Sequence, residues 1–359
     1  MIINRMDVQG VRNLRDVHIQ PACGVNLISG ANASGKTSLL EAIHLFGQAR
    51  SFRTQRIGSV INHASECLQV TGEVGEAGGT TLHRIGIRRC AQHTRIRLDQ
   101  QDVHQISRIA NLLPLQLLTP ESGALLEQGP SQRRKFIDWG LFHVEHAFLG
   151  SWQAFSRALK QRNAALRCGE GSERIRIWDQ ALIENGERIT RLRQEYVESL
   201  RDPVSEVCRR LLGFYPQLHY RQGWRQETTL EDALDASQER DRQRGITTVG
   251  PQRADLACLV EGKPVQEVFS RGQLKMLVAA MRIAQAGHLA RIQQKQPIFL
   301  VDDLAAELDR KHRRVLLELL AETGAQTFVT ATDPELIDVS PWQERRVFHV
   351  EHGKIAEVV

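Results

Sequence analysis

Long apolar runs are absent from this sequence of 359 residues. No stretch reaches the roughly 18 apolar residues that a membrane-spanning helix needs. The N-terminal segment carries the charged residues Arg5 and Asp7 and has no long apolar core, so it does not resemble a signal peptide. We therefore expect a cytoplasmic protein that neither spans a membrane nor has a membrane partner.

Paired cysteine motifs are absent as well. The six cysteines are scattered and form no C-x-x-C pair, which argues against a zinc-binding or redox motif of that kind. They are Cys23, Cys67, Cys90, Cys168, Cys208 and Cys258. Because cytoplasmic thiols are kept reduced, we expect all six to be reduced, buried thiols.

A strong excess of one charge is also missing. The chain has 47 lysines and arginines against 42 acidic residues, and the two signs are interleaved along its length. The net charge of +5 permits a nucleic-acid partner but is only a weak indication of one. The length fits two or three domains, or one large α/β domain with an insertion.

One phosphate-binding motif is complete. Gly30 and Gly35-Lys36-Thr37 match the pattern G-x-x-x-x-G-K-[ST]. The glycines let successive backbone N–H groups converge on phosphate oxygens, Lys36 is placed to reach the terminal phosphates, and Thr37 offers a hydroxyl to Mg²⁺. The residues predicted to bind ATP are Gly30, Ala31, Asn32, Ala33, Ser34, Gly35, Lys36, Thr37 and Ser38.

The residues on either side of this loop support the same interpretation. The apolar segment 25–28 indicates a buried strand before the loop. Leu39, Ile43 and Phe46 recur at helical spacing after it. A helix that begins at the loop directs its positive dipole end toward a bound anion, so strand, loop and helix together predict a nucleotide site.

A second motif lies far along the chain, where the apolar segment 297–301 is followed by Asp302 and Asp303. In nucleotide hydrolases, an apolar strand ending in a carboxylate holds the Mg²⁺ of the bound nucleotide. We assign Asp302 to the metal, and Asp303 with Lys36 to catalysis, because a second carboxylate can orient and deprotonate the attacking water. Taken alone, the segment could equally be a core strand ending in a polar turn.

The distance between the two motifs requires a large insertion between strands of one sheet. Alternating apolar residues predict mostly antiparallel strands before about residue 103, whereas helical periodicity dominates residues 133–212. We predict three parts: the first half of an ATPase head at 1–130, an inserted helical lobe or arm at 131–245, and the second half of the head at 246–359.

A short polar segment before an apolar helical stretch offers a further anion-binding helix N-terminus. It consists of Ser270, Arg271, Gly272 and Gln273. One subunit does not need two phosphate cradles for one nucleotide, so we predict a head-to-tail homodimer in which these residues contact the partner's ATP. Residues Ala306 to Asp309 are expected at the same interface. Taken alone, the segment is equally consistent with a helix cap.

In this order, the motifs resemble the RecF family of recombinational-repair ATPases, which is related to ABC and SMC-type ATPase heads. The resemblance covers nearly the whole chain. It also rests on Arg12-Asn13-Leu14, Leu40-Glu41-Ala42-Ile43, Arg50-Ser51-Phe52-Arg53, Arg133-Arg134-Lys135-Phe136-Ile137-Asp138 and Gly250-Pro251-Gln252-Arg253.

The resemblance implies an α/β fold, an ABC-type P-loop ATPase head with an antiparallel β portion and an inserted, mainly helical lobe. It implies ATP and Mg²⁺ as cofactors, dimerisation on ATP, and weak, DNA-dependent hydrolysis with a regulatory role. It further implies binding to gapped DNA at single-strand/duplex junctions. RecO and RecR type mediators would then place RecA on single strands in DNA repair, replication and the SOS response to DNA damage.

Two positions depart from expected patterns. Gln252 stands where the Gly-Pro-x-Arg motif is expected to have histidine, and Thr332 stands where transport ATPases carry a switch histidine, which suggests weak γ-phosphate sensing. Gln116 is a candidate Q-loop glutamine by position only. Two other functions stay open: an ABC transporter ATPase subunit, which needs a membrane partner, and a DNA clamp that holds ATP structurally.

Overall fold

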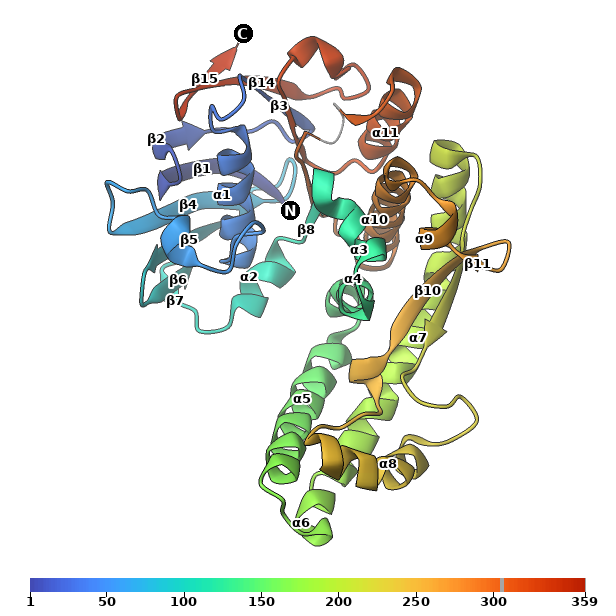
Figure 1. Cartoon of the computed structure of the whole chain (residues 1–359). Helices are drawn as coiled ribbons and strands as arrows, with labels where there is room; N and C mark the ends of the chain where they lie inside the picture. Colours follow the sequence, from blue (N-terminus) through green and yellow to red (C-terminus); the bar gives the residue numbers. More distant parts are fainter. Residues whose placement is uncertain (304–306, 359) are drawn as a thin grey trace. The chain divides into compact units, whose positions relative to one another are not determined.

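The computed structural model describes residues 1–303 and 307–358. Contacts within the chain divide it into two compact units, Met1–Ser122 with Ala286–Val359, and Gly123–Gln285 (Figure 1). The predicted helical lobe at 131–245 falls in the second unit, which also takes in residues 246–285. The three-part functional division at residues 130 and 245 stays a prediction.

An antiparallel sheet forms one layer of the first unit, as the alternation of apolar residues predicts. Its strand order is β2-β1-β4-β5-β6-β7, and a turn that contains Gly78 and Gly79 joins β4 to β5. The strands are β1 (Ile2–Val11), β2 (Leu14–Ile19), β4 (Cys67–Gly75), β5 (Leu82–Cys90), β6 (Thr94–Leu98) and β7 (Gln101–Asp102).

The second sheet of this unit carries both nucleotide motifs. Its order is β15-β14-β3-β13-β12-β8, and all neighbours in it are parallel except β15 with β14. The strands are β3 (Val25–Ser29), β8 (Leu115–Leu118), β12 (Ile298–Val301), β13 (Thr327–Ala331), β14 (Arg345–Glu351) and β15 (Lys354–Val358). Strands β3, β12 and β13 are buried along their whole length, as central parallel strands must be.

Helix α1 (Lys36–Gln48) packs against both sheets, which explains why it is apolar on more than one face. Leu39, Ile43 and Phe46 are fully buried and share one core with Met6 of β1 and Leu300 of β12. Burying each such side chain contributes roughly 1.5–3 kcal/mol, so this core fixes α1 and the loop before it. The unit also contains α2 (Ile106–Leu112), α11 (Arg310–Glu322) and the short helices η1 (Ile57–Ser59), η2 (Pro120–Gly123) and η5 (Pro334–Leu336).

The second unit is mainly helical, as predicted, with a small three-stranded sheet in the order β11-β10-β9. Its helices are α3 (Ala124–Glu127), α4 (Pro130–Val144), α5 (His146–Arg167), α6 (Ser172–Arg176), α7 (Asp179–Leu212), α8 (Leu230–Arg244), η3 (Pro251–Arg253) and α9 (Val265–Val268). The strands are β9 (Gln217–Arg221), β10 (Asp255–Val260) and β11 (Lys263–Pro264). Helix α10 (Arg271–Gln293) crosses the boundary between the units. Within the described residues, no helix combines the length and apolarity needed to cross a membrane.

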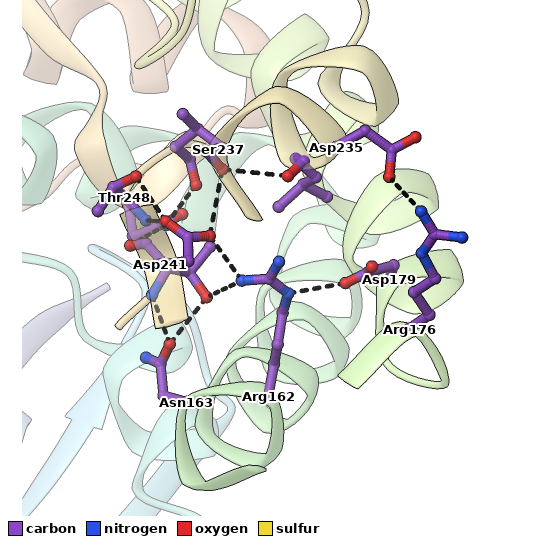
Figure 2. A network of polar contacts seen from close by, with 12 residues as sticks. Arg162, Asn163, Arg176, Asp179, Asp235, Ser237, Asp241 and Thr248 are labelled. Atoms are coloured by element: carbon purple, nitrogen blue, oxygen red, sulfur yellow. Dashed lines mark hydrogen bonds and ion pairs between the residues drawn. The ribbon is translucent and has the colours of Figure 1, made fainter. Parts of the chain in front are cut away.

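A buried polar network joins α5, α7 and α8 within the second unit (Figure 2). Arg162 donates from Nε to Asp179 Oδ1 at 2.7 Å and from Nη1 to Asp241 Oδ2 at 2.8 Å. The Asp241 carboxylate also accepts the backbone N–H and the hydroxyl of Thr248, at 2.9 and 2.6 Å. The Arg162 side chain is 1% exposed and that of Asp241 0%, so each buried charge is compensated by the other.

The prediction of six reduced, buried thiols was wrong for four positions, one of which is the half-buried Cys23. Cys67 and Cys90 form a disulfide, because the register of β4 and β5 places them directly opposite each other. Their separation of 23 residues matches no local motif, so only the strand pairing brings them together. Cys168 is exposed, while burial raises the pKa of the Cys208 and Cys258 thiols to about 12.

Candidate nucleotide site

The phosphate-binding loop connects β3 to α1, as the sequence predicts. Gly30 and Gly35 have φ values of 151° and 127°, which other residues rarely adopt. A Cβ on Gly30 would lie 2.3 Å from the carbonyl oxygen of Val350 and 2.8 Å from Ser34 Oγ. The loop can therefore adopt this conformation and pack against β14 only because Gly30 lacks a side chain.

Lys36 lies across this loop with its side chain buried. Its Nζ donates to the carbonyl oxygens of Gly30 at 2.8 Å and Ala31 at 3.1 Å. A buried ammonium group needs acceptors, and charged phosphate oxygens are stronger acceptors than carbonyl groups. Lys36 therefore fits the role of a phosphate ligand from its place at the start of α1.

The two motifs meet at the carboxyl edge of the second sheet. Thr37 Oγ1 donates to Asp302 Oδ1 at 3.0 Å, and Thr330 Oγ1 donates to the same oxygen at 2.9 Å. Burial raises the pKa of Asp302, while the bonds from Thr330 and Thr37 and the charge of Arg53 act in the opposite direction. A hydroxyl and a carboxylate side by side are the hard oxygen donors that Mg²⁺ prefers.

Asp303 lies next to this pair in an uncommon conformation, with a φ of 47°. Its backbone N–H donates to Thr330 Oγ1 at 2.9 Å, whereas its Oδ1 is buried with no hydrogen-bond partner among the described residues. A buried acceptor left without a donor is costly, so this oxygen fits a water or another ligand group. Thr330 thus holds both carboxylate residues, although no motif in the sequence marks it.

The Thr37 hydroxyl and the Asp302 carboxylate fit an Mg²⁺ ion that is bound together with ATP, rather than an ion held by protein side chains alone. Within residues 1–303 and 307–358, no three His, Cys, Asp or Glu side chains are grouped to hold an ion. Mg²⁺ typically takes one or two carboxylates and completes its shell with water and phosphate oxygens, so one carboxylate beside a phosphate cradle is enough.

A cavity of about 920 Å³ opens beside the loop. It has space for the nucleoside part of a nucleotide next to the phosphate cradle. Its wall is formed by Arg12, Asn13, Arg15, Asp16, Ala33, Ser38, Arg53, Ser59, Ile61, Asn62, His63, Ala64, His352, Gly353 and Lys354.

Glu41 of α1 organises one side of this cavity. Arg12 binds its carboxylate through two hydrogen bonds, Nε to Oε2 at 2.8 Å and Nη2 to Oε1 at 2.9 Å. Ser51 donates to Glu41 Oε1 at 2.5 Å, and Arg53 Nη1 lies 3.9 Å from Oε2. The Glu41 side chain is fully buried, so one compensated charge fixes two segments that line the cavity.

His44, one turn further along α1, anchors the same segment. Its Nδ1 lies 2.7 Å from the carbonyl oxygen of Arg50, so this nitrogen carries the proton of the neutral ring. The ring also meets Phe52 edge to face. Burial lowers the pKa of His44 to about 4, with the bond to Arg50 acting in the opposite direction.

The segment predicted to act on the partner's ATP caps α10. Ser270 N donates to Gln273 Oε1 at 2.9 Å, and Gln273 N donates to Ser270 Oγ at 3.3 Å, which is a reciprocal capping box. Arg271 and Gly272 are exposed. The alternative interpretation as a helix cap is confirmed, and the contact with a partner's nucleotide stays a prediction.

Asp309 caps the N-terminus of α11, and its side chain is exposed. It accepts the backbone N–H groups of Lys311 and His312, both at 3.0 Å, and these bonds hold its pKa below the usual range. Ala306, also predicted at the dimer interface, lies outside the described residues.

Comparison with known proteins identifies the family. The family described as RecF/RecN/SMC N terminal domain matches residues 2–356. A "DNA replication and repair protein RecF" from Shewanella baltica (strain OS155 / ATCC BAA-1091) is 41% identical over 365 residues, with 100% of both chains covered. The chain belongs to the RecF family. A RecF from Thioalkalivibrio sulfidiphilus (strain HL-EbGR7) is 40% identical over 358 residues, with 99% of each chain covered.

Solved structures confirm the predicted fold class. A structure titled "Structure of the recombination mediator protein RecF-ATPrS in RecFOR pathway" has a TM-score of 0.87 at 25% identity and covers 100% of this chain and 98% of its own. An SMC head bound to the C-winged helix domain of ScpA has a TM-score of 0.61 at 16% identity, covers 100% and 98%, and supports the fold alone. Both neighbours are consistent with an α/β ATPase head with inserted helices.

The positions singled out beside the motifs are Gln252, which departs from the expected Gly-Pro-x-Arg motif, Thr332, which stands where transport ATPases carry a histidine, and the Q-loop candidate Gln116. Gln252 donates from Nε2 to the carbonyl oxygen of Val249 at 2.7 Å, while its Oε1 is buried without a partner among the described residues. Thr332 is exposed just after β13. Gln116 is fully buried within β8. This burial does not support its assignment as a Q-loop glutamine.

Proposed function

We propose that this protein is an ATP-dependent DNA-binding protein of replication and recombinational repair, which dimerises on ATP and hydrolyses it slowly. The observation that carries the proposal is the 3.0 Å hydrogen bond between Thr37 and Asp302, which joins the phosphate cradle to the metal carboxylate. Relatives named for DNA replication and repair, and a RecF-ATP structure of the RecFOR pathway, support it.

In this proposal the backbone N–H groups from Gly30 to Ser38 hold the phosphates, and Lys36 binds the terminal one. Thr37 and Asp302, the latter through water, hold Mg²⁺, which when bound neutralises charge on the phosphates. Thr330 keeps the Asp302 carboxylate in place. The cavity of about 920 Å³ takes the nucleoside, with Arg12 and its partners along one wall.

Asp303 is the proposed general base of hydrolysis. Its buried Oδ1 has no donor among the described residues, so it is free to accept a hydrogen bond from a water molecule. Accepting that proton as the water attacks the terminal phosphate is the role of a positioned carboxylate. We also propose that ATP hydrolysis depends on DNA and has a regulatory role.

Residues 270–273 are proposed to complete the site of a second subunit. Ser270 Oγ accepts the N–H of Gln273 as a cap, which leaves its own hydroxyl proton available for a phosphate oxygen of the partner's ATP. Capping and binding in trans are therefore compatible. Asp309 is proposed at the same interface.

DNA at single-strand gaps, with RecO and RecR type mediators, is the proposed setting, in the cytoplasm. Contacts with phosphates release counterions, so DNA affinity should fall steeply as salt rises.

Sizing the protein with and without ATP and Mg²⁺ tests the proposal. Wild type should shift from monomer to dimer, and Lys36→Ala should stay monomeric with ATP. Titration with gapped DNA at 50 and 200 mM salt should show binding that weakens strongly with salt. A size unchanged by nucleotide would remove the dimer, and a flat salt response would remove phosphate-dominated DNA binding.

A further inference from the structure

The turn between β14 and β15 reaches the phosphate-binding loop for a topological reason. Strand β14 runs parallel to β3, with Arg345 opposite Val25 and His349 opposite Ser29. Parallel strands in this register end at the same edge of the sheet, so the turn after β14 arrives where the loop after β3 begins. The C-terminal hairpin is thus placed beside a loop near the start of the chain.

The tip of this hairpin donates a hydrogen bond to the loop. His352 and Gly353 have φ values of 46° and 75°, as the two central residues of a type I′ turn do. The backbone N–H of Gly353 donates to the carbonyl oxygen of Ser34 at 2.9 Å. A Cβ on Gly353 would lie 2.2 Å from the carbonyl oxygen of Asn13, so the close approach requires glycine.

A second turn holds the same oxygen from another direction. Asn13, between β1 and β2, donates from Nδ2 to Ser34 O at 2.8 Å. The carbonyl oxygen of Ser34 therefore receives two donors, one from each turn. Because C=O and N–H point in opposite directions in a trans peptide, fixing this oxygen also fixes the N–H of Gly35, which belongs to the phosphate cradle.

We propose that the β14–β15 turn is a working part of the nucleotide site, and that Gly353 is a positioning residue which, with Asn13, sets the phosphate loop for a nucleoside triphosphate. The inference rests on the proposed binding of ATP. His352, Gly353 and Lys354 also line the cavity beside the loop, so the turn borders the space for the nucleoside as well.

Gly353→Ala tests the inference, and the chain supplies a matched control. Glu261 and Gly262 form the same kind of turn between β10 and β11, with φ values of 51° and 76°, and a Cβ on Gly262 would meet nothing within 4 Å. Gly262→Ala therefore has the same backbone strain but no contact with the loop.

We expect Gly353→Ala to weaken binding of a fluorescent ATP analogue with Mg²⁺ by tenfold or more, and Gly262→Ala to stay within twofold of wild type. Thermal unfolding is measured for both, to confirm that each is folded at the temperature of the titration. Asn13→Ala keeps the Gly353 turn intact and should weaken binding by threefold or more. The double variant Asn13→Ala/Gly353→Ala should lose less than the product of the two single losses, because both act on Ser34 O.

Binding by Gly353→Ala within twofold of Gly262→Ala would overturn the inference, as would full affinity in Asn13→Ala. Failure of wild type to bind the analogue would instead overturn the proposed function, and the inference with it.

Discussion

The hydroxyl of Thr37 and the carboxylate of Asp302 are joined by a 3.0 Å hydrogen bond although 265 residues separate them in the sequence. The contact follows from the strand order, because β3 and β12 end at the same edge with β13 between them. Thr330, near the end of β13, donates to the same oxygen at 2.9 Å. Three strands therefore build the metal end of the candidate site.

Thr330→Val should impair this arrangement while keeping the shape of the side chain. It removes the donor to Asp302 and the acceptor for the Asp303 N–H, so we expect Mg²⁺-dependent ATP turnover to fall about tenfold or more, in line with the loss of one or two buried hydrogen bonds. Thr327→Val is the control, because this hydroxyl in the same strand bonds Ala325 instead. Equal turnover in the two variants would exclude the role of Thr330.

Asp303→Asn should separate binding from hydrolysis. Loss of a general base typically lowers a rate about 10²- to 10⁴-fold, so turnover should drop by that order while ATP affinity and dimer formation persist. Steady-state phosphate release and sizing with ATP measure the two effects. Wild-type turnover in this variant would show that Asp303 is not the catalytic carboxylate.

His44 should make stability depend on pH below neutrality. Its pKa is about 4 in the folded chain against 6.5 for an ordinary histidine, so between these values the unfolded chain binds a proton that the folded chain does not. Stability should therefore rise with pH from about 4 to 6.5, with a histidine contribution of up to about 3 kcal/mol.

Urea unfolding of wild type and His44→Gln across this pH range isolates the effect. The difference in stability between them should change in this window and level off above pH 7. A constant difference from pH 4 to 7 would show that the ring is not buried in its neutral form.

Asp241→Asn should destabilise the second unit strongly. It leaves Arg162 buried with part of its compensating charge removed, and breaking a buried pair in this way typically costs about 3–5 kcal/mol. Asp235→Asn is the control, because its 3.3 Å pair with Arg176 is more than half exposed on both sides (Figure 2). Exposed pairs contribute about 0–1 kcal/mol, so chemical denaturation should separate the two variants clearly. Similar losses would contradict the buried network.

The Cys67–Cys90 disulfide should stabilise the antiparallel sheet in oxidised protein. For a closed loop of this size, the restricted unfolded chain contributes about 3 kcal/mol. Unfolding with and without dithiothreitol measures the contribution, and Cys90→Ser should be insensitive to the reductant. Oxidised wild type that unfolds like Cys90→Ser would contradict the pairing.

The parts of the site that carry a sequence motif were predictable, Asp302 included, whereas contacts of residues outside these motifs that depend on strand order were not. Strand β3, the loop and α1 are continuous, so spacing and apolar periodicity were enough to predict them. The bonds of Thr330 to Asp302, Arg12 to Glu41 and Gly353 to Ser34 join distant segments. A threonine near the end of an apolar strand was the only signal for Thr330, and it is a common pattern.

The position of the C-terminal hairpin also orders events during protein synthesis. The phosphate loop leaves the ribosome early, whereas the turn that holds Ser34 leaves it after every other segment named in the nucleotide site. A chain whose translation stops before Arg345 contains the whole phosphate-binding motif but lacks β14 and β15. Prematurely terminated chains of this kind would carry the motif without the hairpin that supports it, and so would compete poorly with complete protein for nucleotide.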